Sequence, residues 1–293
     1  MAKKMSSTRT SRDVVIVRHG ERCDFVFNRG EQLSWVQRAF DSQGKYTPFD
    51  INLPRNIPKR KNGPEAYEHD SPLTEMGYLQ CKLVGRAMRD ENVDITSIYC
   101  SPALRCIQTA VGIVKGMGLG SSKKCDVRIN VEPGLFEWMM WCRGRQPEFL
   151  DDEDLNKLAA GGYPINTNYV RFYETKVLKL DEPFDSYWRR SSALVKSIIN
   201  NHNEGTVLIV GHSGSPDTLS RELCGNPKRT MEDFYTIIRN IPYLSTLRLT
   251  EHPRKGWQIA GSPIQPMTHG MNPTFDPTIF TMTTEELTEN YGM

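Results

Sequence analysis

The sequence has no apolar run of the roughly 20 residues that a bilayer-spanning helix needs. Its first twelve residues are basic and polar without an apolar segment, so they do not resemble a secretory signal and predict a disordered tail. Neither sign of charge is in excess, because 37 basic and 35 acidic residues leave a net charge of +2. We therefore expect neither a membrane nor nucleic acid as a partner.

Cysteine pairs at metal-ligand spacing are also missing. No Cys-x-x-Cys motif occurs, the spacing is irregular and the number of cysteines is odd. This argues against a disulfide framework or a zinc site, and favours reduced, mostly buried thiols in a cytoplasmic protein without a metal or cofactor. The seven cysteines are Cys23, Cys81, Cys100, Cys106, Cys125, Cys142 and Cys224.

What the sequence does contain is an alternation of short apolar runs and amphipathic stretches. The runs are typical of strands buried in a parallel sheet, and they lie at residues 13–17, 98–100, 127–131, 206–210, 245–249 and 257–259, the last two as candidate edge strands. Helical patterns lie at residues 75–90, 101–114, 187–201 and 231–239. The alternation predicts a three-layer α/β/α fold with a mostly parallel central sheet.

Residues near the helix ends predict where three of these helices begin. Thr74 is placed to cap the helix at 75–90, and Ser101 followed by Pro102 resembles the start of the next one. Thr230 and Asp233 resemble a capping box. The apolar stripe predicted for the first of these helices consists of Leu79, Leu83, Val84, Ala87 and Met88.

Two long stretches, residues 23–71 and 137–185, interrupt the alternation. Structureless loops of that length are uncommon, so we expect insertions with local helices that wall a pocket. The aromatic residues Phe25, Trp35 and Tyr46 of the first insertion either line this pocket or pack in the core. We expect one domain at residues 13–270, preceded by the tail at 1–12 and followed by a C-terminal tail at 271–293.

Three strand ends carry groups suited to one site. His19 follows the first strand, His212 follows the strand at 206–210, and Arg105 comes shortly after the strand at 98–100. Ligands in open α/β sheets bind outside the carboxyl ends of the strands. Arg18 and Arg22 flank His19, and guanidinium groups match phosphate oxygens in bidentate contacts. Their positive charge disfavours protonation of the imidazole and leaves a nucleophilic lone pair.

Three motifs together resemble the histidine phosphatase superfamily, which has the fold of phosphoglycerate mutase and the acid phosphatases. They are RHGER at 18–22, SPALRCIQTA at 101–110 and Gly211-His212. A closer resemblance is to the phosphatase domain of the suppressor of T-cell-receptor-signalling (ubiquitin-associated and SH3 domain-containing) proteins and to ecdysteroid-phosphate phosphatase. It rests on residues 21–27, 99–102, 131–138, 241–244 and 268–270. The resemblance covers residues 13–270.

The resemblance implies a role for each matching residue. His19 would accept the phosphoryl group, and Glu137 would donate a proton to the leaving group. The phosphate pocket would be formed by Arg18, Arg22, Arg105 and His212. The apolar neighbours of Glu137 in the sequence would favour its protonated form. A homodimer is also implied, whereas partners of ubiquitin-binding and SH3 domains are not, since only twelve residues precede Asp13.

Three functions remain open at this point. The first is a phosphatase acting through a phosphohistidine on phosphotyrosine-like or steroid-phosphate-like esters, and therefore including a protein tyrosine phosphatase. The second is a sugar-phosphate mutase, and the third is a catalytically weak binding or scaffold protein. Residues 213–216 depart from the closer branch, which puts the pocket rim and the substrate preference in doubt. His69 either caps a helix or lines the entrance.

Overall fold

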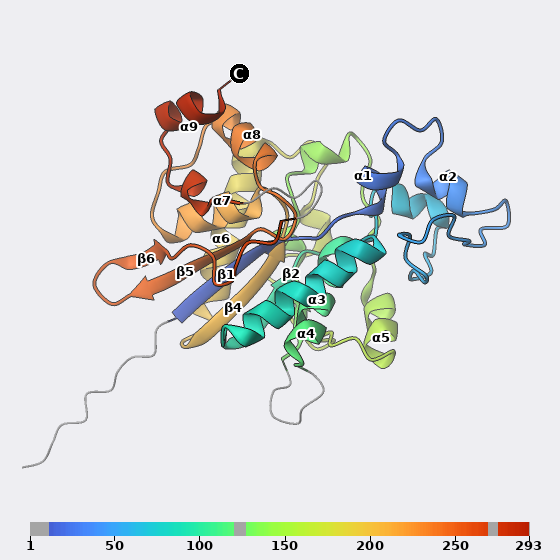
Figure 1. Ribbon diagram of the computed structural model, residues 1–293, viewed down its shortest axis with the longest axis horizontal. Helices are drawn as coiled ribbons and strands as arrows, with labels where there is room; N and C mark the ends of the chain where they lie inside the picture. Colours follow the sequence, from blue (N-terminus) through green and yellow to red (C-terminus); the bar gives the residue numbers. More distant parts are fainter. Residues whose placement is uncertain (1–11, 120–126, 269–274, 293) are drawn as a thin grey trace, which may run out of the picture.

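A six-stranded sheet forms the centre of the protein in a computed structural model that describes residues 12–119, 127–268 and 275–292 (Figure 1). The strand order is β3-β2-β4-β1-β5-β6. Four strands are mutually parallel: β1 (Arg12–Arg18), β2 (Ile95–Cys100), β3 (Ile129–Val131) and β4 (Gly205–Gly211). β5 (Thr246–His252) pairs antiparallel with β1, and β6 (Gly256–Ile259) pairs antiparallel with β5. The predicted mostly parallel sheet is confirmed. Of the two candidate edge strands only β6 lies at an edge, whereas β5 lies inside the sheet and β3 forms the other edge.

Helices cover both faces of the sheet. On one face α3 (Glu75–Asp90) and α4 (Leu104–Met117) pack on a core that includes Val15 and Val17 of β1. On the other face α6 (Phe184–Asn200) and α7 (Ser215–Leu223) share a second core with Val14 and Ile16. Alternate residues of one strand therefore serve two cores, which explains its continuous apolar run.

Two predicted helix starts are confirmed and one is wrong. The Thr74 side chain caps α3, and Thr230 caps α8 (Met231–Arg239), although the reciprocal half of that capping box does not form. α4 begins at Leu104 rather than at Ser101. Its first free N–H, on Leu104, donates to the carboxylate of Asp70 at 2.8 Å. A side chain 34 residues away in the sequence therefore takes the capping role.

The predicted apolar stripe of α3 is also partly wrong. Leu79 and Leu83 are 45% and 37% exposed, and the buried face is centred on Cys81, Val84 and Gly85 instead. A methyl group added to Gly85 would lie 2.1 Å from the carbonyl oxygen of Ile113 in α4. Close approach of the two helices at glycine, and not side-chain hydrophobicity alone, therefore sets which face of α3 is buried.

The two insertions contain local helices, as predicted. In the first these are α1 (Cys23–Phe27), α2 (Trp35–Ala39) and the 3-10 helix η1 (Pro64–Glu68), which lie together beyond one end of the sheet (Figure 1). The second insertion contains α5 (Asp152–Ala160) and the 3-10 helices η3 (Met139–Cys142) and η4 (Thr175–Val177), and follows η2 (Pro133–Leu135). Trp35 is buried and Tyr46 packs against the first core, whereas Phe25 is 63% exposed.

The C-terminal segment packs onto the domain. The 3-10 helix η5 (Pro277–Phe280) and α9 (Thr284–Tyr291) insert Ile279, Phe280 and Leu287 into the second core. The domain boundaries stay predictions, because residues 1–11 and 269–274 lie outside the described residues, and so do Cys125 and the motif residues His269 and Gly270. Arg12, assigned to the tail, begins β1.

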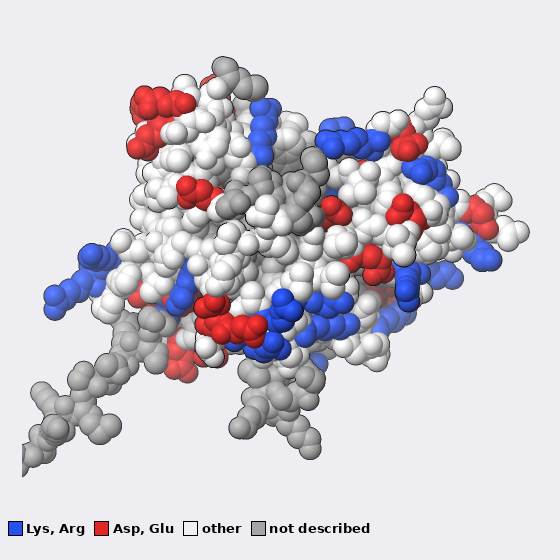
Figure 2. Space-filling model, viewed as in Figure 1, with Lys and Arg blue, Asp and Glu red and all other residues white. Residues whose placement is uncertain are grey.

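Six cysteines in the described part of the chain are free thiols, five of them buried, as the irregular spacing predicts. None of the described helices is both long and apolar enough to span a membrane. On the face in Figure 2 acidic and basic side chains are interspersed along the lower edge instead of gathering by sign. This distribution is in line with the near-zero net charge.

We expect Gly85→Ala to lower the free energy of unfolding by about 1–3 kcal/mol, because the new methyl group forces α3 and α4 apart. Helix propensity alone predicts the opposite sign, a gain of about 1 kcal/mol. Chemical denaturation measures the change. Gly161→Ala is the matched control, since its methyl group meets nothing closer than 3.3 Å, and equal effects of the two substitutions would contradict the account.

Candidate functional site

Three neighbouring parallel strands deliver the predicted site residues to one edge of the sheet. His19 follows β1, His212 follows β4, and Ser101 follows β2, which leads to Arg105 in α4. Backbone hydrogen bonds from His19 N to Gly211 O (2.9 Å) and from Ser101 N to Val210 O (3.0 Å) continue the sheet ladder past the strand ends. The loops are therefore held in register with each other.

His19 is buried, with 3% of its surface exposed, and its ring is fixed by one hydrogen bond. Nδ1 lies 2.8 Å from the carbonyl oxygen of Gly20. Because a carbonyl can only accept, Nδ1 carries the proton and Nε2 keeps its lone pair. Space around Gly20 is tight, since a methyl group on it would lie 3.2 Å from both Cys81 Sγ and Gly77 O of α3.

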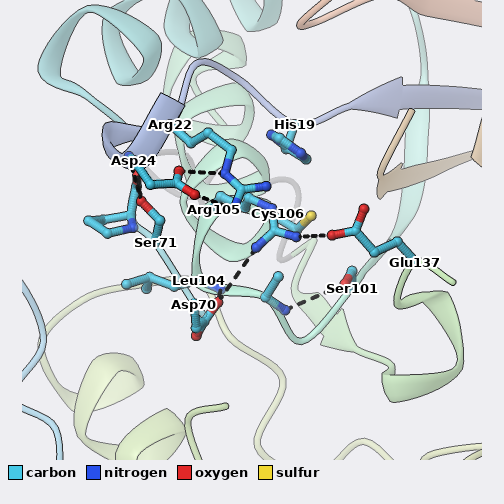
Figure 3. Close-up of polar contacts among 12 residues, drawn as sticks. His19, Arg22, Asp24, Asp70, Ser71, Ser101, Leu104, Arg105, Cys106 and Glu137 are labelled. Atoms are coloured by element: carbon cyan, nitrogen blue, oxygen red, sulfur yellow. Dashed lines mark hydrogen bonds and ion pairs between the residues drawn. The ribbon is translucent and has the colours of Figure 1, made fainter. Parts of the chain in front are cut away.

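Three guanidinium groups surround this imidazole. Arg22 makes a bidentate ion pair with Asp24, with both N–O distances at 2.6 Å. In Figure 3 Arg105 lies between that pair and Glu137. Arg18 donates to the carbonyl oxygen of Ile241 and stacks on Tyr243, 4.3 Å from the ring centre. All three predicted arginines thus lie at the site.

Several donors of these arginines are buried without a hydrogen-bond partner among the described residues. They are Nε of Arg18 and both Nε and Nη1 of Arg105, although Nη1 also lies 3.9 Å from Asp70. Leaving buried donors unpaired is unfavourable, particularly on charged groups. The arrangement fits an oxyanion, whose several acceptor atoms would satisfy these N–H groups.

The environment keeps both buried histidines neutral. Burial lowers the pKa of His19 well below its ordinary value of 6.5, and the positive charge of Arg105 lowers it further. The same two causes, in the same order, lower the pKa of His212. The predicted effect of the arginines is confirmed, but loss of solvation is the larger cause. A neutral His19 is nucleophilic at neutral pH.

His212 lies beside His19, with 5.4 Å between the ring centroids. Its Nδ1 is 3.2 Å from Arg105 Nη2, which can only donate, so Nε2 carries the proton and donates to Ser101 Oγ at 2.8 Å. Ser101 thereby orients this ring, and that explains why its hydroxyl is not used to cap α4.

Glu137 lies where a proton donor is expected, but not in the apolar surroundings that its sequence neighbours suggested. Its carboxylate accepts from Arg105 Nη2 at 2.5 Å and lies 3.6 Å from His212 Nδ1. Phe136 and Trp138 are buried, and Phe136 also lines the cavity, with 5.2 Å between its ring centroid and that of His212. The hydrogen-bond partner of the acid is nevertheless a cation, Arg105.

A buried scaffold that the sequence did not reveal holds the loop of Glu137. Arg190 of α6 donates to the carbonyl oxygens of Gly134 (2.8 Å) and Phe136 (2.9 Å) and pairs with Glu182. The fully buried carboxylate of Glu132 accepts from Gly134 N at 2.8 Å. Loss of solvation raises the pKa of Glu132 despite these hydrogen bonds. The catalytic candidate is therefore placed by other charged groups.

Other residues of the site were missed because their signals are not local. Asp24 orients Arg22, Tyr243 lies against both Arg18 and His19, and Asp70 is fully buried beside Arg105. Tyr243 belongs to the motif at 241–244 and could have been found there. Asp70 follows His69 in a loop, and nothing in its spacing indicates burial.

A cavity of about 500 Å³ opens over these groups. Arg18, His19, Arg22, Arg105 and Glu137 line it, and His212 lies directly behind. Both insertions contribute to its wall, as predicted. His69 lines the cavity and is also the C-cap residue of η1, so the structure agrees with both of its predicted places. The residues from the insertions and from α8 are Asp24, Phe25, Glu68, His69, Trp141, Cys142, Arg143, Tyr235, Ile238 and Arg239.

Within the described part of the chain, no group of three or more His, Cys, Asp or Glu side chains is placed to hold a metal ion. Among the charged residues that line the cavity, five arginines exceed three acids, which suits an anion rather than a metal. The predicted absence of a metal or cofactor stays a prediction.

Comparison with known proteins gives matches over most of the chain. A model of the histidine phosphatase superfamily (branch 1) matches residues 64–259. Ecdysteroid-phosphate phosphatase of Drosophila melanogaster is 34% identical over 268 residues, covering 91% of this chain and 34% of the relative. Mouse ubiquitin-associated and SH3 domain-containing protein B is 36% identical over 263 residues, covering 88% and 40%. The chain thus spans between a third and two fifths of these relatives.

Among solved structures, the ecdysone phosphate phosphatase of Bombyx mori in complex with tungstate has a TM-score of 0.75 with this chain. It is 29% identical, and the alignment covers 90% of this chain and 98% of that one. The similarity therefore includes the central sheet and the insertions that wall the cavity.

We expect stability to fall as the pH drops below 6.5, the ordinary pKa of histidine. Below that pH the unfolded chain protonates His19 and His212 while the folded chain does not, so protons favour unfolding. Each histidine contributes up to about 1.4 kcal/mol per pH unit to this loss of unfolding free energy.

Urea unfolding between pH 7.5 and 5 measures this slope. His19→Asn should flatten it, whereas His252→Asn, at the exposed end of β5, serves as the control. Parallel profiles of the wild type and His19→Asn would contradict the assignment.

Proposed function

Because this chain belongs to the histidine phosphatase superfamily (branch 1), we propose that it hydrolyses phosphomonoesters through a phosphohistidine on His19. One observation carries the proposal. The Nδ1 proton of His19 is held by Gly20, which leaves Nε2 as a nucleophile in a cavity lined by three arginines. Phosphoryl transfer requires little beyond such positioning and cationic stabilisation.

In the first step the lone pair of Nε2 attacks phosphorus, a nitrogen–phosphorus bond forms, and the bond from phosphorus to the ester oxygen breaks. Arg18, Arg22 and Arg105 stabilise the charge on the three equatorial oxygens. Glu137, in its protonated form, donates a proton to the departing oxygen.

In the second step water attacks phosphorus and the nitrogen–phosphorus bond breaks, which returns the lone pair to His19. Glu137, now a carboxylate, accepts the proton from water. Inorganic phosphate leaves and the starting protonation states are restored. One carboxyl group thus serves both half-reactions, and no metal ion enters either of them.

Bulky aromatic or steroid-like esters suit the mouth of the cavity. Phe25, Trp141 and Tyr235 line it, and Phe25 and Trp141 are 63% and 38% exposed. We therefore propose phosphotyrosine-like or steroid-phosphate-like substrates, the second of which is in keeping with the name of ecdysteroid-phosphate phosphatase. A homodimer and a cytoplasmic location stay part of this proposal, which light scattering and cell fractionation would test.

We expect His19→Ala to reduce kcat/KM for p-nitrophenyl phosphate by at least roughly 10³-fold, because the nucleophile is lost. A substrate panel of this ester, a phosphotyrosine peptide, a steroid phosphate and phosphoglycerate would accompany the variant. Rapid quenching should trap an acid-labile phosphoenzyme on the wild type only. No turnover of any ester by the intact chain would refute the enzymatic function, and turnover that survives His19→Ala would refute the mechanism.

We expect Glu137→Gln to slow esters with poor leaving groups by roughly 10²–10⁴-fold, the usual contribution of a general acid. For esters whose leaving group departs without protonation, such as dinitrophenyl phosphate, the rate of the phosphorylation step should fall much less. A plot of rate against leaving-group pKa, measured in single turnovers, checks this. An equal loss for every ester would assign Glu137 to binding rather than to proton transfer.

A further inference from the structure

Two aromatic side chains form one side of the cavity mouth. Trp141, at the end of η3, and Tyr235 of α8 contact each other edge to face, with 5.2 Å between ring centroids. Both line the cavity. A segment of the second insertion and the helix α8 are therefore fixed against each other at this side of the mouth.

Two arginines flank this aromatic pair. Arg143 follows Trp141 by two residues, and Arg239 follows Tyr235 by four, which places both on one face of α8. Both arginines line the cavity and are exposed. Neither side chain makes a hydrogen bond or an ion pair with the residues that the structure describes.

The acidic residues of the same cavity do not neutralise these two arginines. Asp24 pairs with Arg22, and Glu137 pairs with Arg105. Glu68 accepts a hydrogen bond from Ser34. The mouth therefore carries positive charge that remains when the deeper arginines hold a phosphate.

The backbone of Arg143 is in an unusual conformation. Its φ and ψ are 50° and 44°, in the left-handed region that glycine and asparagine tolerate better. Left-handed residues are common at helix C-termini, and Arg143 is the C-cap residue of η3. Arg239 likewise lies at the C-terminus of α8, so both arginines occupy helix ends where a positive charge is favourable.

A neighbouring cavity has the opposite character. It holds about 630 Å³ and shares Glu68 and His69 with the first one. Asp41, Glu65 and Glu148 also line it, with Arg145 as the cation. The surroundings of the phosphate pocket are thus acidic on the side of the first insertion and basic at Arg143 and Arg239.

We propose that Arg143 and Arg239 form a second anion subsite, which binds a carboxylate or a further phosphate carried by the substrate beyond its phosphorylated aromatic ring. The inference rests on the proposed phosphatase activity and narrows its substrate to a phosphotyrosyl peptide with an acidic neighbour. A steroid phosphate has no charge outside its ester and would leave both arginines unused.

Phosphotyrosyl peptides of one sequence test the subsite. The residue beside phosphotyrosine is Glu, Gln, Lys or phosphoserine, placed either before or after it. Exposed ion pairs are weak, so we expect the best Glu peptide to exceed its Gln counterpart in kcat/KM by roughly 3- to 10-fold at low salt. The Lys peptide should fall below Gln at that position, and added salt should reduce the difference.

The double variant Arg143→Gln with Arg239→Gln should bring the Glu-to-Gln ratio to within about twofold, and each single variant should lower it. Arg254→Gln, an exposed arginine of the β5–β6 turn, removes the same charge away from the mouth and should leave the ratio unchanged. A larger gain from phosphoserine than from Glu assigns the subsite to phosphate, and the reverse assigns it to carboxylate.

Two outcomes would overturn the subsite: equal rates for the Glu and Gln peptides at both positions, or a preference that survives the double variant. p-Nitrophenyl phosphate, measured in parallel, separates this failure from that of the proposed function. If the wild type hydrolyses that ester without any charge preference, only the subsite is wrong. If it hydrolyses no ester, the phosphatase proposal itself fails.

Discussion

The structure depends on the burial of three guanidinium groups around one neutral imidazole. Of the acids that line the cavity, only Asp24 and Glu137 contact these arginines, so positive charge remains in a site that water barely solvates. Burying cations with too few partners opposes folding, and an oxyanion relieves that penalty. Burial lowers the pKa of His19 most, and the same excess of positive charge lowers it further. Binding and nucleophilicity therefore have one electrostatic origin.

Such a site requires a rigid support, because repulsion between the cations would otherwise spread them apart. The support comes from buried polar groups outside the cavity. Asp70 joins the first insertion to the start of α4, and Arg190 joins α6 to the loop of Glu137. Ser101 holds the ring of His212. Each contact links segments far apart in the sequence, so the geometry of the site depends on the correct packing of the whole fold.

Local patterns predicted the parts of this arrangement that local physics determines. The strand before His19 is apolar on both faces, and the run after it concentrates donors, so both could be recognised. Contacts between distant residues could not. The start of α4 depends on Asp70, and the buried face of α3 depends on the glycine contact at Gly85. The neighbours of Glu137 in space differ from its neighbours in sequence for the same reason.

The packing of the C-terminal segment extends to the cavity mouth. Arg229, which precedes α8, pairs with Asp217 and donates to the carbonyl oxygens of Phe280 and Met282, while Thr284 of α9 donates to Asp233 of α8. Residues 277–291 therefore brace the helix that carries one of the mouth arginines. A purification tag, a fusion partner or a proteolytic cut at this end would therefore change substrate selectivity. The point at which the polypeptide is cut for expression affects the activity that is measured.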